Sequence, residues 1–247
     1  MLVLPNAWDA ISARIVEAEG FPAVASSSAG CAAVLGYADG QRIPAAEMLM
    51  LVGRIAASVD VPVTADVEAG YGDPVETVRA LVDAGVVGLN FEDMAHDELL
   101  PLPQQLDRIR AVRGVSAMLV INARTDIFLA SHGDPATRFD RAVERLNAFL
   151  EAGADCAFAP GVEDAETIAR LVQSVRGPLN ILAGPSTPAL SILESLRVAR
   201  VSFGSGPSRV ALGAFQRFVR ELRRSGTFEA LGSGTVPYAE VQKMLSE

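Results

Sequence analysis

Residues 61–93 read VPVTADVEAGYGDPVETVRALVDAGVVGLNFED and contain the repeating unit of the predicted fold. Two β-rich runs, residues 61–66 and 86–92, flank a segment at 75–84 whose apolar side chains have helical spacing. Asp73 followed by Pro74 is typical of a helix start, because aspartate caps free N–H groups and proline fits the first helical position. The stretch therefore predicts a strand, a helix and a second strand, the unit of a parallel sheet.

The same alternation continues through the rest of the 247 residues. Further strands are expected at residues 2–4, 23–27, 118–124, 156–160, 179–183 and 200–203. Further helices are expected at residues 10–19, 45–58, 136–152, 165–175 and 208–225. Eight strands alternating with helices predict an α/β fold, a (β/α)8 TIM-type barrel in a single domain over residues 1–247. An open doubly wound sheet is the alternative, but no G-x-G-x-x-G motif opens a helix after an early strand.

Composition excludes several classes of function. The net charge of −9, from 21 basic and 30 acidic residues, argues against a nucleic-acid partner. Lys243 is the only lysine and lies close to the end of the sequence, so a Schiff-base lysine on a barrel strand is excluded. Cys31 and Cys156 have no metal-binding spacing. The long uncharged stretches, 21–38 and 177–193, are broken by Gly, Ser or Pro, so no membrane span is expected and the expected location is the cytoplasm.

Acidic residues gather where the third and fourth predicted strands end. In barrels of this kind, the chemistry lies at the carboxyl ends of the strands. Asp66, Glu68 and Glu92 would therefore share one mouth of the barrel. Carboxylates placed together repel one another unless a cation lies between them, and Mg²⁺ prefers oxygen ligands while keeping several waters. The sequence thus predicts a Mg²⁺ site, the alternative being that some of these acids pair with Arg124 or face solvent.

Two further strand ends offer groups that bind anions. Arg124 ends the fifth predicted strand and could form two parallel hydrogen bonds with a substrate carboxylate. Its alternative role is a structural ion pair with Glu92 or Asp126. The small-residue turn at 27–30 exposes backbone N–H groups that could hold an anion, although such turns are common.

Four blocks of sequence, in order, carry a resemblance to a known family. Residues 66–72, DVEAGYG, resemble the acidic D-x-D-x-G-[YF]-G signature of the isocitrate lyase/phosphoenolpyruvate mutase superfamily. Residues 35–40 (LGYADG), 91–93 (FED) and 123–126 (ARTD) resemble further blocks of the same family. The resemblance extends from residue 4 to residue 205, nearly the whole chain.

The resemblance implies a (β/α)8 barrel whose eighth helix is swapped between subunits of a homodimer or homotetramer. The helical segment from about residue 208 would then pack on a neighbouring subunit. It also implies Mg²⁺ bound near Asp66, Glu68 and Glu92, partly through water, with Asp39 nearby as a catalytic residue. Other family positions implied here are the active-site arginine at Arg124, the substrate-binding residues Ser27, Ser28 and Ala29, and the substrate-binding asparagine of the lyase branch at Asn180.

The activity that the resemblance implies is cleavage of a C–C bond beside a carbonyl group. The substrate would be a small 2-oxo or 2-hydroxy carboxylic acid, cleaved by a retro-aldol step or by decarboxylation. Mg²⁺ would stabilise the enolate charge, which needs no covalent intermediate and so agrees with the lack of a suitable lysine.

The sequence departs from the family pattern after Glu92. The lyases carry a K-[KR]-C-G-H loop whose cysteine takes part in acid–base chemistry, whereas residues 93–100 read DMAHDELL. His96 is the residue of this loop that could titrate near neutral pH, and it is either catalytic or a solvated loop histidine. Pro160 replaces the acid of the lyases and the histidine of the mutases. Glu68 is one methylene longer than the usual aspartate.

Two other functions remain open from the sequence. One is an enzyme that acts on a P–C bond, a phosphonopyruvate hydrolase or a phosphoenolpyruvate mutase-like enzyme. A phosphoryl group would require more positive charge than Arg124 alone supplies, so this function ranks lower. The other is a weakly catalytic protein that binds 2-oxo acids, because the acid–base positions of the family are replaced here.

Overall fold

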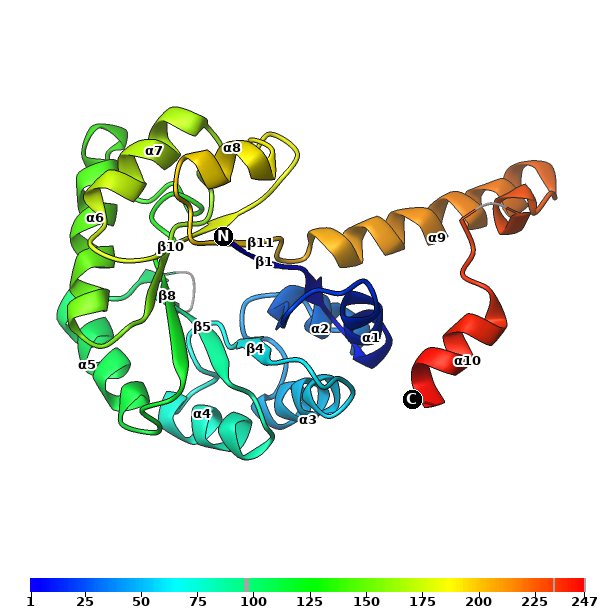
Figure 1. Ribbon diagram of the computed structural model, residues 1–247, viewed down its shortest axis with the longest axis horizontal. Coiled ribbons are helices and arrows are strands. Elements are labelled where there is room, and N and C mark those ends of the chain that lie inside the picture. Colours follow the sequence, from blue (N-terminus) through cyan, green and yellow to red (C-terminus); the bar gives the residue numbers. More distant parts are fainter. Residues whose placement is uncertain (96–97, 233, 247) are drawn as a thin grey trace.

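The computed structural model describes residues 1–95, 98–232 and 234–246. A parallel sheet curves into a barrel with helices around its outside (Figure 1). The strands of the sheet, each hydrogen-bonded to the next, lie in the order β1-β11-β10-β9-β8-β5-β4-β3-β2. The strands are β1 (Leu2–Leu4), β2 (Asn6–Ala7), β3 (Val24–Ser26), β4 (Val63–Asp66), β5 (Gly88–Glu92), β8 (Val120–Arg124), β9 (Cys156–Phe158), β10 (Leu179–Leu182) and β11 (Arg200–Ser202).

Pro5 marks the place where the two edges of the sheet meet. On one side of it β1 pairs with β11, and on the other side β2 pairs with β3, both in parallel. Proline has no N–H group to donate, so strand pairing is interrupted at this residue. Its carbonyl oxygen still accepts a hydrogen bond from Ala25 N at 3.2 Å. The first predicted strand, residues 2–4, pairs with one edge, and its continuation as β2 pairs with the other. The (β/α)8 barrel prediction is confirmed.

The helices that surround the barrel are α1 (Ala10–Ala18), α2 (Ser28–Val34), α3 (Ala45–Ala56), α4 (Pro74–Asp83), α5 (Leu102–Arg113), α6 (Pro135–Glu151), α7 (Ala165–Ser174) and α8 (Leu190–Ser195). Three of these, α2, α5 and α8, were not predicted. The segment 27–30, predicted as a small-residue turn, is the start of α2, where the Ser27 side chain accepts from Gly30 N at 3.2 Å. Helix α5 follows Pro101 and tolerates Pro103 because the first helical turn needs no N–H donors.

Strand residues alternate between an apolar outer layer and a polar barrel interior. Leu89, Phe91 and Ile121 are fully buried in the core beneath the helices. Their neighbours Asn90 and Asn122 point the other way, because successive side chains of a strand face opposite sides of the sheet. The interior of this barrel is therefore rich in amides, which places polar groups directly below the carboxyl ends of the strands.

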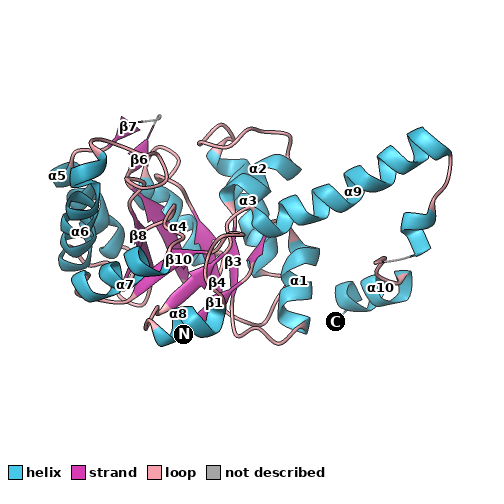
Figure 2. Cartoon of the chain, turned by 90° about the horizontal axis from the view of Figure 1, so that it is seen from above, coloured by secondary structure: helices cyan, strands magenta, loops and turns pink. Residues whose placement is uncertain are grey.

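Two elements extend beyond the barrel. Helix α9 (Gly206–Ser225) projects away from it, and α10 (Tyr238–Ser246), which follows a 3-10 turn at Glu229–Gly232, returns beside α1 (Figures 1 and 2). A hairpin of β6 (Met94–Ala95) and β7 (Glu98–Leu99) follows β5. Over the described ranges 1–95, 98–232 and 234–246, every helix is too short or too polar to cross a lipid bilayer.

Candidate active site

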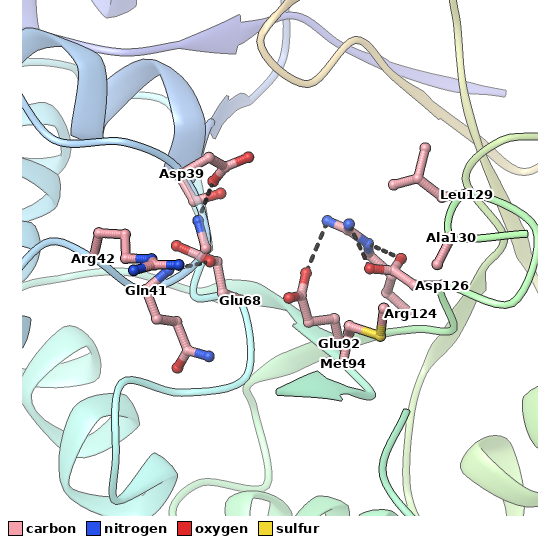
Figure 3. Close-up of a pocket in the computed structure, with 12 residues that line it drawn as sticks. Asp39, Gln41, Arg42, Glu68, Glu92, Met94, Arg124, Asp126, Leu129 and Ala130 are labelled. Carbon is pink, nitrogen blue, oxygen red and sulfur yellow. Dashed lines mark hydrogen bonds and ion pairs between the residues drawn. The ribbon is translucent and has the colours of Figure 1, made fainter. Parts of the chain in front are cut away.

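Two neighbouring cavities, which share part of their lining, lie at the carboxyl ends of the strands. The outer cavity has a volume of about 460 Å³, and its lining includes Glu68, Glu92 and Asp126 (Figure 3). The inner cavity has a volume of about 120 Å³ and lies deeper in the barrel mouth. Three residues belong to the lining of both cavities: Ser28, Asp39 and Arg124. Most of the predicted site residues therefore line one or both of these adjoining cavities.

Asp66, at the end of β4, is buried and only half satisfied. Its Oδ2 atom accepts hydrogen bonds from Ser28 N at 3.2 Å and from Ser28 Oγ at 2.8 Å. Its Oδ1 atom is buried and has no hydrogen-bond partner among the described residues. An unpaired buried carboxylate oxygen is costly, so this atom is ready to accept a cation or a donor from outside the chain.

Glu92 and Asp126 both pair with Arg124. Arg124 Nη1 lies 3.0 Å from Glu92 Oε2, and its Nε and Nη2 donate to the two oxygens of Asp126 at 2.6 and 2.8 Å (Figure 3). Burial raises the pKa of Glu92 well above its usual value, although the Arg124 cation opposes that rise. Burial also disfavours the Arg124 cation, but the two carboxylates outweigh it and raise the pKa of Arg124. The planar fork of Arg124 is thus already engaged by Asp126.

Glu68 faces this group across the outer cavity (Figure 3). Its Oε1 accepts from Tyr71 Oη at 2.7 Å, and its Oε2 accepts from Gln41 N at 2.7 Å. Burial raises the pKa of Glu68 to about 7; the bond from Tyr71 lowers it, and the Asp66 and Asp39 charges add to the rise. The bond from Gln41 to Oε2 therefore holds the loop at 36–43, which carries Asp39 at the rim of both cavities, while Oε1 is held by Tyr71.

The predicted anion-binding residues lie in different layers. Ser27, Ser28 and Ala29 line the inner cavity at the start of α2. Asn180 is fully buried and lines neither cavity; its Nδ2 donates to Ser202 Oγ at 3.1 Å, and Ser202 does line the inner cavity. His96, predicted as a catalytic residue, lies outside the described residues.

Sequence reasoning missed Asn90, which lines the inner cavity. The signal was present, because Asn90 precedes Glu92 by two positions on a strand and must share its face. Among the described residues, no three His, Cys, Asp or Glu side chains converge as a group able to hold a metal ion. The acids are instead spread around the two cavities.

Comparisons with known proteins agree with this architecture. Residues 1–223 match the family model described as phosphoenolpyruvate phosphomutase. The chain is 32% identical over 245 residues to the protein Rv1998c of Mycobacterium tuberculosis (strain ATCC 25618 / H37Rv), covering 98% of this chain and 91% of that protein. It is 28% identical to 2,3-dimethylmalate lyase of Eubacterium barkeri, covering 99% and 89% of the two chains.

Among solved structures, the chain is similar to oxaloacetate acetylhydrolase in complex with its product oxalate. The TM-score is 0.87 at 25% identity, covering 100% of this chain and 89% of that one. The family resemblance carried by the four sequence blocks is confirmed by these matches. The chain belongs to the phosphoenolpyruvate phosphomutase family, within the isocitrate lyase/phosphoenolpyruvate mutase superfamily of lyases and mutases.

Proposed function

We propose that this protein is a Mg²⁺-dependent lyase that cleaves a C–C bond of a small 2-oxo or 2-hydroxy carboxylic acid. The observation that carries the proposal is the excess of carboxylates in a buried mouth where Asp66 Oδ1 has no partner within the described part of the chain. The relatives' names add support, since one is a 2,3-dimethylmalate lyase and another a 2-methylisocitrate lyase.

The carboxylates of the mouth suit a divalent cation. Burial and mutual repulsion disfavour the ionised forms of Glu68 and Glu92, and a cation would relieve both. Asp66 and Glu92 would hold the ion, partly through water, because Mg²⁺ usually keeps several of its waters. Glu68 would contribute mainly its charge, since both of its oxygens accept hydrogen bonds from the chain. When bound, the ion would supply Lewis-acid stabilisation of the negative charge that develops as the bond breaks.

The chain's own groups would orient the substrate. Arg124 borders both cavities, and the N–H bonds left over from its pairs with Glu92 and Asp126 would bind one carboxylate. Arg124 also lies over the ring of Phe158 at 5.9 Å, which limits its movement. Asp39 lies at the exposed rim, on the loop at 36–43 that Glu68 holds through Gln41. This loop would cover the entrance of the cavity, and Asp39 would face the substrate there.

A P–C bond enzyme is the second candidate, favoured by the description of the matched family model. The lining of the cavities weighs against it. Among the described residues, Arg42 and Arg124 are the basic residues that border the outer cavity, and Arg124 is already paired with two carboxylates. A phosphoryl group carries more charge than a carboxylate and would require stronger compensation.

The test is calorimetric titration with Mg²⁺ present, using pyruvate, oxaloacetate, 2-oxoglutarate, oxalate and phosphonopyruvate. Turnover of oxaloacetate, 2,3-dimethylmalate and phosphonopyruvate is then assayed, with Asp66→Asn as the matched control. Metal-dependent turnover of a carboxylic acid that Asp66→Asn lacks would support the lyase. Turnover of phosphonopyruvate alone would support the second candidate, and metal-dependent binding without turnover of any compound would favour a binding protein.

A further inference from the structure

Asn90 lines a part of the inner cavity where no site residue was predicted. It lies on β5 in register with Asp66 on β4, and it is 5% exposed. The wall around it also includes Ser27 and Ser202, so polar groups of several strands surround the same small space.

The oxygen of the Asn90 amide is fully used by the barrel interior. Its Oδ1 accepts a hydrogen bond from Asn122 Nδ2 at 2.7 Å and another from Arg200 Nη2 at 3.1 Å. An amide oxygen has two lone pairs, so both acceptor positions are filled. Because a guanidinium group can only donate, turning the amide over would set two donors against each other. The network thus determines which way this amide points.

The Asn90 NH2 group, in contrast to the oxygen, is available to bind a ligand. It makes no hydrogen bond to any of the residues that the structure describes, and Asn90 borders the inner cavity. The amide therefore presents two N–H donors to whatever occupies that cavity. A neutral donor beside Asp66 suits a ligand oxygen that accepts hydrogen bonds, such as a carboxylate or a carbonyl oxygen.

Arg200, which donates to the Asn90 oxygen, is a buried cation. It is 6% exposed and forms no ion pair with a carboxylate within the described ranges 1–95, 98–232 and 234–246. Burial lowers the pKa of Arg200, while the charges of Cys156 and Asp66 oppose that change. A buried guanidinium without a carboxylate is expensive for the fold. Its positive charge lies against the Asn90 oxygen, where it polarises the amide and strengthens Asn90 as a donor.

We propose that Asn90 is a substrate-binding residue whose NH2 group donates to an oxygen of the bound carboxylic acid, and that Asn122 and Arg200 are its positioning residues. This inference rests on the proposed function, since it assigns a specificity residue to the same site. It assigns the inner cavity to an anionic, acceptor-rich fragment of the substrate and disfavours a fragment that could only donate.

The substitution Asn90→Asp isolates the donor. Aspartate has the same size and still accepts from Asn122 and Arg200, so the network and the fold are retained, while the NH2 group is replaced by a negatively charged oxygen. Oxalate in the presence of Mg²⁺ is the probe, titrated calorimetrically. Its affinity should fall by about tenfold or more, the effect of losing one hydrogen bond to a charged ligand. The control is Asn147→Asp on α6, away from both cavities, where Asn147 Nδ2 donates to Ser174 O and Oδ1 accepts from Arg176 N. The affinity of this variant for oxalate should stay within about twofold of that of the parent protein.

The charge that Asn90→Asp adds could by itself repel oxalate, so a direct readout is needed. The side-chain amide resonances that disappear in Asn90→Asp identify the Asn90 NH2 group in a nitrogen-15 correlation spectrum. They should shift when oxalate is added to the parent protein with Mg²⁺. Equal affinity in Asn90→Asp, or unmoved resonances on saturation, would overturn the inference while leaving the proposed function intact. No binding of oxalate, pyruvate or oxaloacetate by the parent protein would overturn both.

Arg200 is tested through Asn90. Arg200→Met should weaken oxalate binding in the parent but have little further effect in the Asn90→Asp background, because the two residues act through one donor. Arg200→Lys, which retains a cation, should restore part of the affinity. Additive losses in the double variant would show that Arg200 supports the fold and not the orientation of the amide.

Discussion

The mouth of the barrel and helix α9 leave opposite kinds of groups without a partner among the residues that the structure describes. At the mouth the unpaired group is the buried Asp66 Oδ1, surrounded by further carboxylates. On α9 the exposed groups are apolar, with Val210 71% and Phe215 64% exposed. A buried charged oxygen is stabilised by a cation or donor at a defined position, whereas an apolar face is stabilised by any surface that removes it from water. The first therefore suits the proposed chemistry, and the second suits the predicted packing on a neighbouring subunit.

The apolar face of α9 continues into a groove of about 340 Å³ between α2 and α9, lined by Trp8, Gly30, Ala33, Val34, Ser208, Ala211, Leu212 and Phe215. Contiguous exposed apolar surface of this kind marks interaction sites. The expectation that the segment from about residue 208 packs on a neighbouring subunit of a homodimer or homotetramer stays a prediction. The four substitutions below test whether the two regions are independent.

Asp66→Asn should have the largest effect. It removes the charge of the unpaired carboxylate, and turnover should fall by roughly a thousandfold, the scale of a lost metal contribution to the transition state. Thermal unfolding should stay unchanged or shift upward, because an uncompensated buried charge is removed. Steady-state kinetics and thermal melts followed by circular dichroism check both, with the exposed Asp83→Asn as control. Full turnover in Asp66→Asn would contradict the metal assignment.

Phe215→Asp should change assembly and leave the mouth intact. Placing a charge in a buried interface should raise the subunit dissociation constant by at least about thirtyfold. Size-exclusion chromatography with light scattering measures the mass over a dilution series. Gln216→Asp, the exposed neighbour on the same helix, should behave like the parent. An unchanged mass in Phe215→Asp, or a parent that is monomeric throughout, would contradict the predicted role of α9.

Arg124→Lys should weaken substrate binding by about tenfold or more. A single ammonium group cannot keep the paired bonds to Asp126, reach Glu92 and bind a carboxylate at once. The expected result is a raised KM with a smaller change in kcat. Arg110→Lys, in an exposed ion pair with Asp107, serves as the matched control and should show neither change. Equal values of KM in both variants would mean that Arg124 has only a structural role.

Glu68→Gln should change the stability of metal-free protein and its dependence on pH. The pKa of Glu68 is raised from 4.5 to about 7 in the folded state, so the folded protein binds this proton more tightly than the unfolded chain. The corresponding stability is present below pH 4.5 and is lost as the pH rises to about 7. That loss, about 1 to 3 kcal/mol, should be absent in Glu68→Gln. Urea unfolding at several pH values with EDTA measures it, with the exposed Glu76→Gln as control. Identical pH profiles for Glu68→Gln and the parent would contradict it.

Much of the fold was readable from local pattern alone. The β-rich runs became strands with slightly shorter bounds, and Asp73 and Pro74 begin α4 as expected, with Asp73 Oδ1 accepting from Val75 N at 2.8 Å. Helix α2 was missed because Ser27–Gly30 reads as a turn until Ser27 is seen to cap a helix. Local signals succeed where capping and alternation act over a few residues, and they fail where neighbouring elements decide.

The site divides in the same way. The sequence by itself determined which residues stand at strand ends, so it identified Asp66, Glu92 and Arg124 as a group, and its four ordered blocks identified the family. Only the tertiary structure decided how these groups are paired: that Asp126 occupies the fork of Arg124, that Asn180 lies beneath the cavity, and that Asn90 is turned by Arg200, 110 residues away in the chain. The physical reason is that strand position follows from local periodicity, whereas hydrogen-bond partners across a barrel depend on closure of the whole ring.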